Sequence, residues 1–554
     1  LLESLLPVWS RAWLQGREVP GMPFIRPCTC SLGAAGIGDP IYVVATQDLA
    51  VDSCRVTPSV RNSELKVATS IRSDSKVART VLIRHQVIDG TETVIASPPR
   101  TVAIEPGMNE SETVIPVDLG KIRLWWPKKP YLYRLRTQIT VDGAAADCHD
   151  VRFGFREFRA DGPVFRINET AIRPGAAAGI PHDYPGIVHY DEKSRIDRWY
   201  ATKKFLRSFF NVNVTLVRYH TEPYPILMFD QADEIGLMIA SEAWMATLPG
   251  KMKLDDQRTW TNFREFYPRW VHREFNHASL VIRSMENELG YHLPAADAPR
   301  SPFGYTPETV ETIVKEMRSL GRLVKRLDPS RPIMYEGSGP VFYEVADIYN
   351  LHYPGIPGNE SLFPITGRRL SIPIDSYREK NWLWDRKKPL YVGEYDSCFG
   401  EPAGFAPLLG KRAYVAGYLY PAHMAIWSYT IPGQRIDGMT AGVPWTILTF
   451  NGVLDELNDN NGKVKLVREM FTPIASFIHQ YRSVYFGGRS VARTVTTLND
   501  SLEEQPITVK WSLQEEGESP VRQGEFEMVL SPAESRRTQI EVALPDVNQK
   551  QTFT

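Results

Sequence analysis

The sequence has no run of 18 or more apolar residues, so it contains no segment long enough to form a transmembrane helix. It also lacks an excess of either charge. The net charge is −1 at pH 7, which excludes a nucleic-acid or membrane-surface role that rests on bulk electrostatics. A hydrophobic content of 43% and a charged content of 23% are ordinary for a globular protein. The length of 554 residues predicts three or four domains.

Cysteine is scarce as well, with five residues, an odd number, scattered along the chain. They predict neither a disulfide framework nor a zinc site, and the spacing of Cys28 and Cys30 is too tight for a CxxC motif. We expect no metal and no cofactor. The chain begins at Leu1 without an initiator Met or a signal pattern. We therefore expect a processed form or an excerpt, and we favour a secreted or periplasmic location over a cytoplasmic one.

Changes in hydrophobic rhythm predict four regions. Residues 1–45 have weak periodicity and resemble the last strands of an incomplete β-unit. Residues 46–158 alternate with period two, which predicts an immunoglobulin-like β-sandwich. Helical and strand patterns alternate over 159–483, which predicts a (β/α)8 (TIM) barrel. Period-two alternation returns over 484–554, as expected for a second sandwich that is incomplete. The fold class is thus α/β plus all-β, with the barrel flanked by sandwiches.

Two buried strands in the barrel region end abruptly in glutamates. Leu280–Ile282 leads within a few residues to Glu288, and Pro389–Gly393 leads directly to Glu394. The two glutamates are 106 residues apart, or three βα units of roughly 35 residues in a barrel of typical size. They should therefore lie at the ends of strands 4 and 7, facing each other across the barrel mouth.

Other polar or aromatic residues follow expected barrel strands, and the carboxyl ends of all strands share one mouth. We expect Arg218 to hold Glu394 as a carboxylate, Asn287 to bind a sugar hydroxyl, and Trp427 to stack against a sugar ring at the end of a strand. The predicted substrate-binding residues are Arg218, His220, Asn287, His352, Tyr353 and Trp427.

Each of these residues also has a structural interpretation. Arg218 could simply neutralise buried acids, His220 and His352 could be satisfied core histidines, and Trp427 could be core packing. Glu242 lies at another expected strand end, and Glu336 is more readily interpreted as a surface or structural acid. We expect Glu286 to point away from the mouth, because it shares a strand face with Glu288 and not with Asn287.

Several segments resemble glycoside hydrolase family 2. Asn287-Glu288 after HREFNHASLVIRS is similar to the acid/base motif of that family. Further similar segments, in order, are Ala35–Pro40, Leu124–Pro127, Pro130–Tyr133, Phe153–Arg156, Arg218–Pro223 and Phe229–Leu237. The resemblance implies that residues 1–45 are the remnant of an N-terminal jelly roll. It also implies a retaining mechanism with Glu288 as acid/base and Glu394 as nucleophile, whose carboxyl groups should lie about 5–5.5 Å apart.

The sequence departs from the family pattern at several positions. Ala278 stands where proline is usual, Arg283 where an aromatic residue is common, and Asn168–Gly175 is a poor copy of the entry segment. The Asn-x-Lys signature that binds a uronic carboxylate is not evident near Thr449–Asp455. This favours a neutral β-linked glycoside, β-galactosidase-like first, and leaves mannosidase, glucosaminidase or a polysaccharide specificity open.

Two other classes of function remain. Glu242, Glu288 and Glu336 at neighbouring strand ends could hold Mg²⁺, as in enolase-type barrels, although this gives Glu394 and Asn287 no role. A carbohydrate-binding or scaffold protein with an inactive barrel is the non-enzymatic alternative. The expected partner is an oligo- or polysaccharide, with no nucleic acid and no membrane, and a homo-oligomer stays open.

Overall fold

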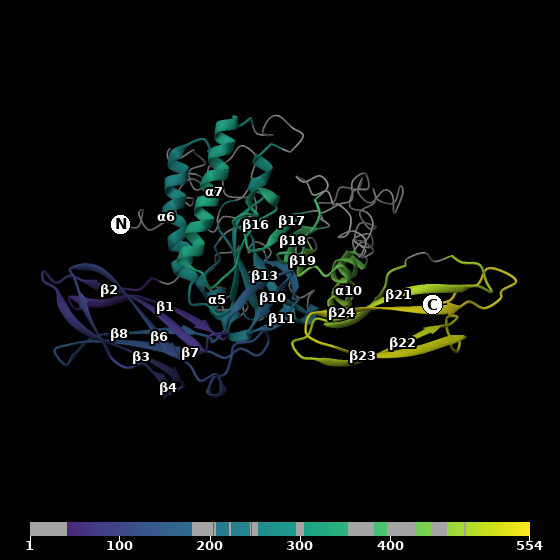
Figure 1. The fold of residues 1–554 in the computed structure, drawn as a ribbon, viewed down its shortest axis with the longest axis horizontal. Coiled ribbons are helices and arrows are strands. Elements are labelled where there is room, and N and C mark those ends of the chain that lie inside the picture. The colour runs from purple at the N-terminus through teal and green to yellow at the C-terminus, as the bar shows by residue number, and fades with distance from the viewer. Residues whose placement is uncertain are drawn as a thin grey trace, which may run out of the picture.

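The chain was analysed as a computed structural model that describes residues 41–179, 203, 206–220, 223–243, 245, 253–294, 304–352, 382–395, 427–428, 430–444, 462–480 and 484–554. Figure 1 shows a central αβ body with β-rich units extending to either side. Residues 1–40, which carry most of the predicted jelly-roll remnant, lie outside the described residues.

The first β-rich unit consists of two antiparallel sheets around a shared apolar core. One sheet holds β1 (Leu49–Ser59), β2 (Glu64–Ser73) and β6 (Gly107–Pro116), and the other β3 (Arg79–Asp89), β4 (Glu92–Ala96), β5 (Arg100–Ile104), β7 (Tyr133–Val141) and β8 (Ala144–Phe153). The 3-10 helix η1 (Leu119–Lys121) precedes β7. The predicted β-rich region is confirmed, whereas its immunoglobulin-like topology stays a prediction.

Among the described residues, eight strands lie in the barrel region, and neighbouring strands within each sheet pair in parallel. They are β12 (Gly175–Gly179), β13 (Val214–Tyr219), β14 (Met238–Glu242), β15 (Leu280–Asn287), β16 (Ile333–Glu336), β17 (Tyr349–His352), β18 (Leu390–Tyr395) and β19 (Ala441–Pro444). In the described residues they form a five-stranded and a three-stranded sheet, β12 to β16 and β17 to β19. The edges of these sheets adjoin, β16 beside β17 and β19 beside β12. The strands are buried on both faces, as parallel strands covered by helices must be.

Helices and a small sheet enclose the strands. The described helices are α5 (Ile226–Ile235), α6 (Gln257–Glu274), α7 (Pro307–Leu327) and α10 (Gly462–Met470), with 3-10 turns η3 (Phe209–Val212), η4 (Leu289–His292) and η5 (Gly339–Phe342). The small antiparallel sheet holds β9 (Phe158–Asp161), β10 (Val164–Ile167) and β11 (Thr170–Ile172). Its apolar residues join one core with Ala176, Leu216 and Met238 near the start of the barrel strands. It therefore covers the end of the barrel opposite the predicted site.

A buried ionic network anchors β15 at that same end, and we call it the base network: Arg283, Glu274, Asp328 and Arg331. Arg283 Nε donates to Asp328 at 3.0 Å, and its Nη1 approaches Glu274 at 3.4 Å. Arg331 donates to Asp328 at 3.0 Å and to the backbone carbonyl of Leu280 at 2.9 Å. Arg283 thus replaces the expected aromatic residue with an ion pair that fixes β15 against α6 and the start of β16.

The first β-unit also docks on the start of β15. Asn276 accepts from the Val56 N–H at 2.9 Å and donates to the Cys54 carbonyl at 2.8 Å. Arg156 donates to the carbonyls of Ala278 at 3.0 Å and Leu280 at 2.6 Å. Since buried backbone carbonyls need donors, these bonds tie the β-unit to the strand that ends in the predicted acid/base.

The C-terminal β-rich unit has one sheet of β20 (Ile474–Ile478), β21 (Ser490–Asn499) and β24 (Glu534–Ala543) and another of β22 (Gln505–Leu513) and β23 (Arg522–Leu530). The three strands predicted between 509 and 544 are present. Because β20 pairs with β21, the unit begins before the expected boundary at 484. Asp500, which accepts from Arg173 at 3.0 Å and Arg435 at 3.0 Å, links it to the barrel.

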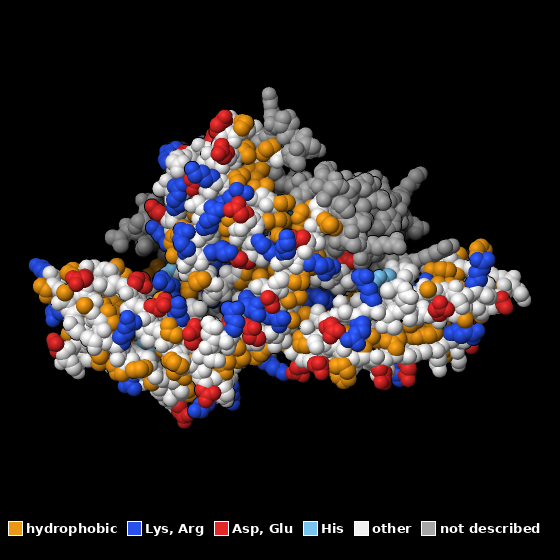
Figure 2. Space-filling view, viewed as in Figure 1, with side chains coloured by type: hydrophobic (Ala, Val, Ile, Leu, Met, Phe, Trp, Pro, Cys, Tyr) orange, Lys and Arg blue, Asp and Glu red, His pale blue; other side chains and the backbone are white. Residues whose placement is uncertain are grey.

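No helix among the described residues is long and apolar enough to cross a membrane. On the face drawn in Figure 2, basic and acidic side chains are intermingled and do not form one large patch of a single sign. The predicted location, the absence of a nucleic-acid partner and the oligomeric state stay predictions.

Candidate active site

Six neighbouring barrel strands bring charged side chains to one end of the barrel. Arg218 lies on β13, Glu242 on β14, Glu336 on β16, His352 on β17 and Glu394 on β18, while Asn287 ends β15 and Glu288 follows it. Counted from β12, β15 is the fourth and β18 the seventh strand, as the spacing of the two glutamates predicted. The parallel order of the strands is what makes these distant residues converge.

Arg218 is the centre of this group and is fully buried. Its Nε donates to Glu242 at 2.9 Å and lies 3.2 Å from a Glu336 oxygen, and its Nη1 donates to Glu394 at 2.9 Å. Its Nη2 donates to the Asn287 side-chain oxygen at 2.5 Å. One guanidinium therefore organises three carboxylates and an amide, and it touches the predicted nucleophile as expected.

Glu288 and Glu394 approach each other closely. One carboxylate oxygen of each, together with a nitrogen of His352, forms a set of atoms that all lie within 4.8 Å of one another. The Glu288 side chain is 17% exposed and that of Glu394 is 4% exposed, so both are near the surface of the barrel mouth and screened from bulk water.

The backbone at Glu288 is unusual. Its φ is +56°, in the left-handed region that residues with side chains rarely adopt. The Glu288 N–H donates to the Glu336 carbonyl at 2.8 Å, and the Asn287 N–H donates to the Met245 carbonyl at 2.7 Å. Strained backbone of this kind clusters at functional sites. Here it turns the Glu288 side chain toward Glu394.

His352 bridges the carboxylates. Its Nδ1 lies 2.9 Å from Glu288 and 3.8 Å from Glu394, and its Nε2 lies 2.9 Å from Glu336. Burial alone disfavours the imidazolium, but the charge of Glu394 and the hydrogen bonds to Glu288 and Glu336 outweigh it and raise the pKa of His352 to about 10. His352 is thus buried with both ring nitrogens bonded, and its partners are the acids of the barrel mouth.

Excess negative charge shifts two further pKa values. Burial, together with the charge of Glu336, raises the pKa of Glu242 to about 8 despite the contact with Arg218. Burial also acts to raise the pKa of Glu336, but Arg218 and His352 overcome it and lower that pKa below its ordinary value. When two carboxylates share one cation, their pKa values move apart. Here Glu336 stays ionised and Glu242 holds its proton more tightly.

Most of the predicted site residues come together. Beyond those described above, His220 is buried, with Nε2 3.7 Å from Glu394. Tyr353 lies outside the described residues. Trp427 is helical, is 1% exposed and packs in the apolar core with Leu390 and Tyr395. The expectation that Trp427 ends a strand is wrong, because the eighth strand is β19, and its position gives no support to sugar stacking.

Sequence reasoning undervalued Glu336. It is fully buried rather than a surface acid, and Asn350 donates to it at 2.7 Å while His352 contacts the same oxygen. Asn350 and His352 share one face of β17, a spacing that offered a signal. Glu286, expected to point away from the mouth, is buried, and one of its oxygens accepts from the Leu289 N–H at 2.6 Å.

Gly393, directly before Glu394, makes room for this arrangement. A Cβ at this position would lie 2.6 Å from His352 Nε2 and closer still to Glu336. Real side chains do not approach so closely, so any other residue at position 393 would force the Glu336 carboxylate and the His352 ring to shift.

The Mg²⁺ alternative required Glu242, Glu288 and Glu336 to share a cation. Glu242 and Glu336 instead share the guanidinium of Arg218, and the hydroxyl of Ser284 also donates to Glu242 at 3.0 Å. Carboxylate oxygens that accept these hydrogen bonds are not free to coordinate a metal ion. The donors around Glu242 and Glu336 therefore argue against a Mg²⁺ site at these residues.

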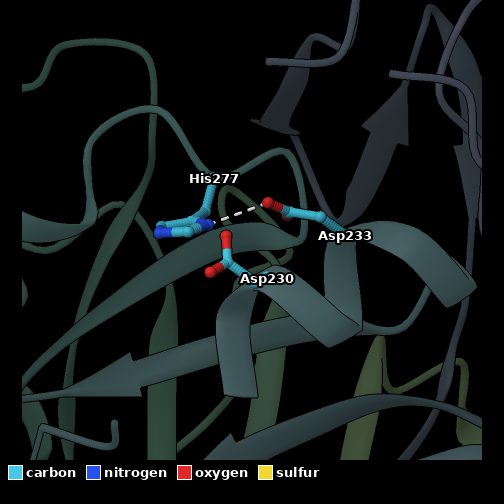
Figure 3. Close-up of side chains that lie close together, drawn as sticks. All are labelled: Asp230, Asp233 and His277. Carbon is cyan, nitrogen blue, oxygen red and sulfur yellow. Dashed lines mark hydrogen bonds and ion pairs between the residues drawn. The ribbon is translucent and has the colours of Figure 1, made fainter. Parts of the chain in front are cut away.

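A second group of acids and a histidine lies outside this site, at the start of β15 (Figure 3). Asp233 of α5 accepts from His277 at 2.8 Å and from the Ser279 N–H at 2.7 Å. Asp230, the third residue drawn, pairs with Arg152 of β8 at 2.5 Å. Each carboxylate has a protein partner, so we interpret the group as a link between α5, β15 and the first β-unit.

Comparison with known proteins identifies two matched regions. The family model described as "Glycosyl hydrolases family 2" matches residues 49–156, and the model described as "Glycosyl hydrolases family 2, TIM barrel domain" matches residues 199–412. These regions contain the first β-unit and the strands β13 to β18. Arg218, Glu288 and Glu394 all lie within the second.

Among curated proteins, a β-galactosidase of Aeromonas hydrophila is 29% identical over 364 residues, which are 63% of this chain and 31% of that protein. A β-galactosidase of Erwinia tasmaniensis is 26% identical over 376 residues, 65% of this chain and 32% of that protein. The matched segments thus span about a third of these relatives.

Among solved structures, a β-D-mannosidase of Dictyoglomus thermophilum superposes with a TM-score of 0.61 at 14% identity, covering 92% of this chain and 64% of that one. A β-galacturonidase of Eisenbergiella tayi superposes with a TM-score of 0.56 at 14% identity, covering 80% and 74%. At such low identity these structures establish a shared fold.

Proposed function

This chain belongs to glycoside hydrolase family 2, and from that premise we propose that it hydrolyses a β-linked glycoside with retention of configuration. Glu394 acts as the nucleophile and Glu288 as the acid/base. The supporting observation is the approach of their carboxylate oxygens to within 4.8 Å. Retaining enzymes place the two carboxyl groups about 5–5.5 Å apart, whereas inverting enzymes need roughly 6.5–9.5 Å to admit a water molecule.

The reaction proceeds in two displacements. First, Glu394 attacks the anomeric carbon, the glycosidic bond breaks, and Glu288 gives its proton to the leaving oxygen. Then Glu288 removes a proton from water, which attacks the glycosyl ester and releases Glu394. Arg218, 2.9 Å from Glu394, stabilises the charge of the nucleophile and aims one of its oxygens at the sugar.

Asn287 and His220 are the described side chains that we assign to the sugar, because both border Glu394 or its arginine. The side-chain oxygen of Asn287 accepts a hydrogen bond from Arg218. Its amide N–H₂ group is therefore the part that would donate to a sugar hydroxyl. Tyr353 keeps its predicted role in substrate binding.

The charges of the site favour a neutral substrate. Four acids, Glu242, Glu288, Glu336 and Glu394, share the positive charges of Arg218 and His352. Among the described residues of the site, the two cations, Arg218 and His352, already pair with these acids, so neither is left to bind a uronic carboxylate. We infer a neutral β-hexoside and favour a β-galactoside, the substrate class in the names of the two curated relatives.

A panel of chromogenic β-glycosides tests this proposal, with galactoside, glucoside, mannoside and glucuronide compared by kcat/KM. The configuration of the first-formed product, followed by NMR, tests the mechanism. Glu288→Gln and Glu394→Gln serve as controls for contaminating activity. A higher kcat/KM for the glucuronide would refute the neutral substrate, an inverted product would refute the mechanism, and saccharide binding without turnover would favour the inactive-barrel alternative.

A further inference from the structure

His352 occupies a position that joins both proposed catalytic groups to a third acid. Its Nδ1 is 2.9 Å from Glu288 and 3.8 Å from Glu394, and the opposite ring nitrogen is 2.9 Å from Glu336. Both nitrogens therefore face carboxylates. Only an imidazolium can donate from both nitrogens at once.

Glu336 is built to face this ring. It is fully buried, and the Asn350 amide donates to the same oxygen that His352 contacts. The absence of a side chain at Gly393 leaves the space in which the two groups meet. The other Glu336 oxygen lies 3.2 Å from Arg218 Nε. The carboxylate is thus held between two cations and cannot turn toward the substrate.

We propose that Glu336 is a positioning residue that keeps His352 as an imidazolium between Glu288 and Glu394, so that one positive charge serves both displacements. This inference rests on the proposed function. In the first displacement Glu394 loses its negative charge to an ester bond, while Glu288 gains one by donating its proton. The negative charge moves from one neighbour of His352 Nδ1 to the other, and no proton leaves the imidazolium.

The geometry fits this transfer. The Nδ1–H lies within a few ångströms of both carboxylates, so a small tilt of the ring follows the charge. A donor already in place stabilises charge as it develops, without reorganisation of water. A neutral imidazole would make a weaker bond, because charge-assisted hydrogen bonds are roughly twice as strong as neutral ones.

The charged groups that act on His352 come from three other strands. Glu336 lies on β16, Glu394 on β18 and Glu286 on β15, with Glu288 just beyond β15. Arg218 contacts two of these acids, Glu336 and Glu394. The acids in this group outnumber the cations. The raised pKa of His352, about 10, agrees with the proposed charge state.

The first test reads the charge of His352 without using activity. In protein labelled with ¹⁵N-histidine, the His352 ring signals are assigned by their loss in His352→Asn. At pH 8 the wild type should show two protonated ring nitrogens. Glu336→Gln should lower the titration midpoint by at least about one pH unit, tenfold in the protonation constant. A neutral ring in the wild type at pH 8 would overturn the proposal, even if Glu336→Gln does not fold.

The second test uses turnover. Glu336→Gln should lower kcat about tenfold, from the weaker bond at Nδ1, and should move the basic limb of the pH profile to lower pH, as His352 now loses its proton earlier. Glu344→Gln is the matched control. It makes the same change at an exposed residue that pairs with Arg322, and it should leave kcat and the pH profile unaltered.

The outcomes separate the two proposals. If no glycoside is turned over but His352 is an imidazolium that depends on Glu336, the proposed function fails and the charge assignment stands. If turnover is normal and Glu336→Gln changes only thermal stability, Glu336 is structural and the inference fails. An unchanged His352 titration in a folded Glu336→Gln protein has the same meaning.

Discussion

Two buried ionic networks flank β15, and they differ in how their charges are matched. In the base network, Arg283 pairs with Asp328 and Glu274, and Arg331 pairs with Asp328. Arg273 adds a contact to Glu274 at 3.1 Å. In the network at the barrel mouth, Arg218 alone contacts three glutamates, and His352 adds the second positive charge for four acids.

The pKa values record this difference. Burial opposes ionisation of Asp328, yet its two arginines lower its pKa to about 2. Glu274, at a longer distance from Arg283, has a pKa raised by burial. At the mouth, Glu242 reaches about 8 and His352 about 10. A matched network stabilises the fold, whereas an acid-rich one keeps shifted protonation states that catalysis can use. Both networks are buried, so the balance of charge, more than burial, separates the two roles.

The largest effect should come from the nucleophile. Glu394→Gln should lower kcat by about 10⁴-fold or more, as loss of a covalent catalytic group does. It should not lower the thermal midpoint, because it removes one of several acids crowded around Arg218. Rates on an activated aryl glycoside and a thermal scan measure both. A clear loss of stability would show instead that the acids at the mouth stabilise the fold, as those of the base network do.

Asp328→Asn, in the base network, should lower stability and leave kcat nearly unchanged, the reverse of Glu394→Gln. It leaves Arg283 and Arg331 buried without their shared carboxylate, and breaking a buried ion pair costs about 3–5 kcal/mol. Urea unfolding followed by tryptophan fluorescence measures the loss, with Asp74→Asn as the matched control, because Asp74 is exposed and pairs only at the surface, with Arg72 at 3.5 Å. The kcat per folded molecule should stay close to that of the wild type. A selective fall in kcat with normal stability would contradict the assignment.

Glu288→Ala should divide substrates by leaving group. Alkyl glycosides need a proton on the leaving oxygen, so their kcat/KM should fall about 10²- to 10⁴-fold, the usual contribution of general acid catalysis. A dinitrophenyl glycoside needs no proton, and its glycosylation rate should change little. Pre-steady-state rates on the two substrates make the measurement. Equal losses on both would remove Glu288 from the acid/base role.

Per pH unit, the smallest effect is the pH dependence of stability, which has opposite signs in the two networks. The folded pKa of Glu242, about 8, exceeds its ordinary 4.5, so the native state binds the extra proton and stability falls as pH rises from about 4.5 to 8. The folded pKa of Asp328, about 2, is below its ordinary 3.8, so its stabilisation is lost as pH falls from about 4 to 2.

Each slope is at most about 1.4 kcal/mol per pH unit for one proton. Unfolding free energies of the wild type, Glu242→Gln and Asp328→Asn across pH 2–8 resolve the two contributions. Glu242→Gln should flatten the neutral range and Asp328→Asn the acidic one. A wild type that gains stability between pH 5 and 8 through Glu242 would contradict the shift at the mouth.

The barrel strands and both proposed catalytic glutamates could be predicted from the sequence, because apolar runs that end in acids mark strand ends. Trp427 could not be placed in this way. Ala425-Ile426-Trp427 is as apolar as a short strand, yet Trp427 is helical, and the true eighth strand, Ala441–Pro444, is only four residues long. Periodicity alone does not separate helix from strand in runs this short.

The roles of Glu336 and His352 could not be predicted for a different reason. They depend on contacts among three strands, β16, β17 and β18, that no local pattern encodes. A charged residue at a strand end signals a site, but which cation neutralises it is decided by side-chain geometry across the barrel. The same holds for Arg283, which reads as a departure from the family pattern and is explained only by Asp328 and Glu274.

The lack of a side chain at Gly393 has a consequence for how this site can change in evolution. The carboxylate of Glu336 and the ring of His352 fill the volume that any other residue would need, so the three positions cannot change independently. An alanine there would displace the carboxylate and the ring from each other, so an engineer who transplants the pair into another barrel should transplant the glycine with it. Glu336, His352 and Gly393 lie far apart in the sequence, yet we expect substitutions at these three positions to occur together.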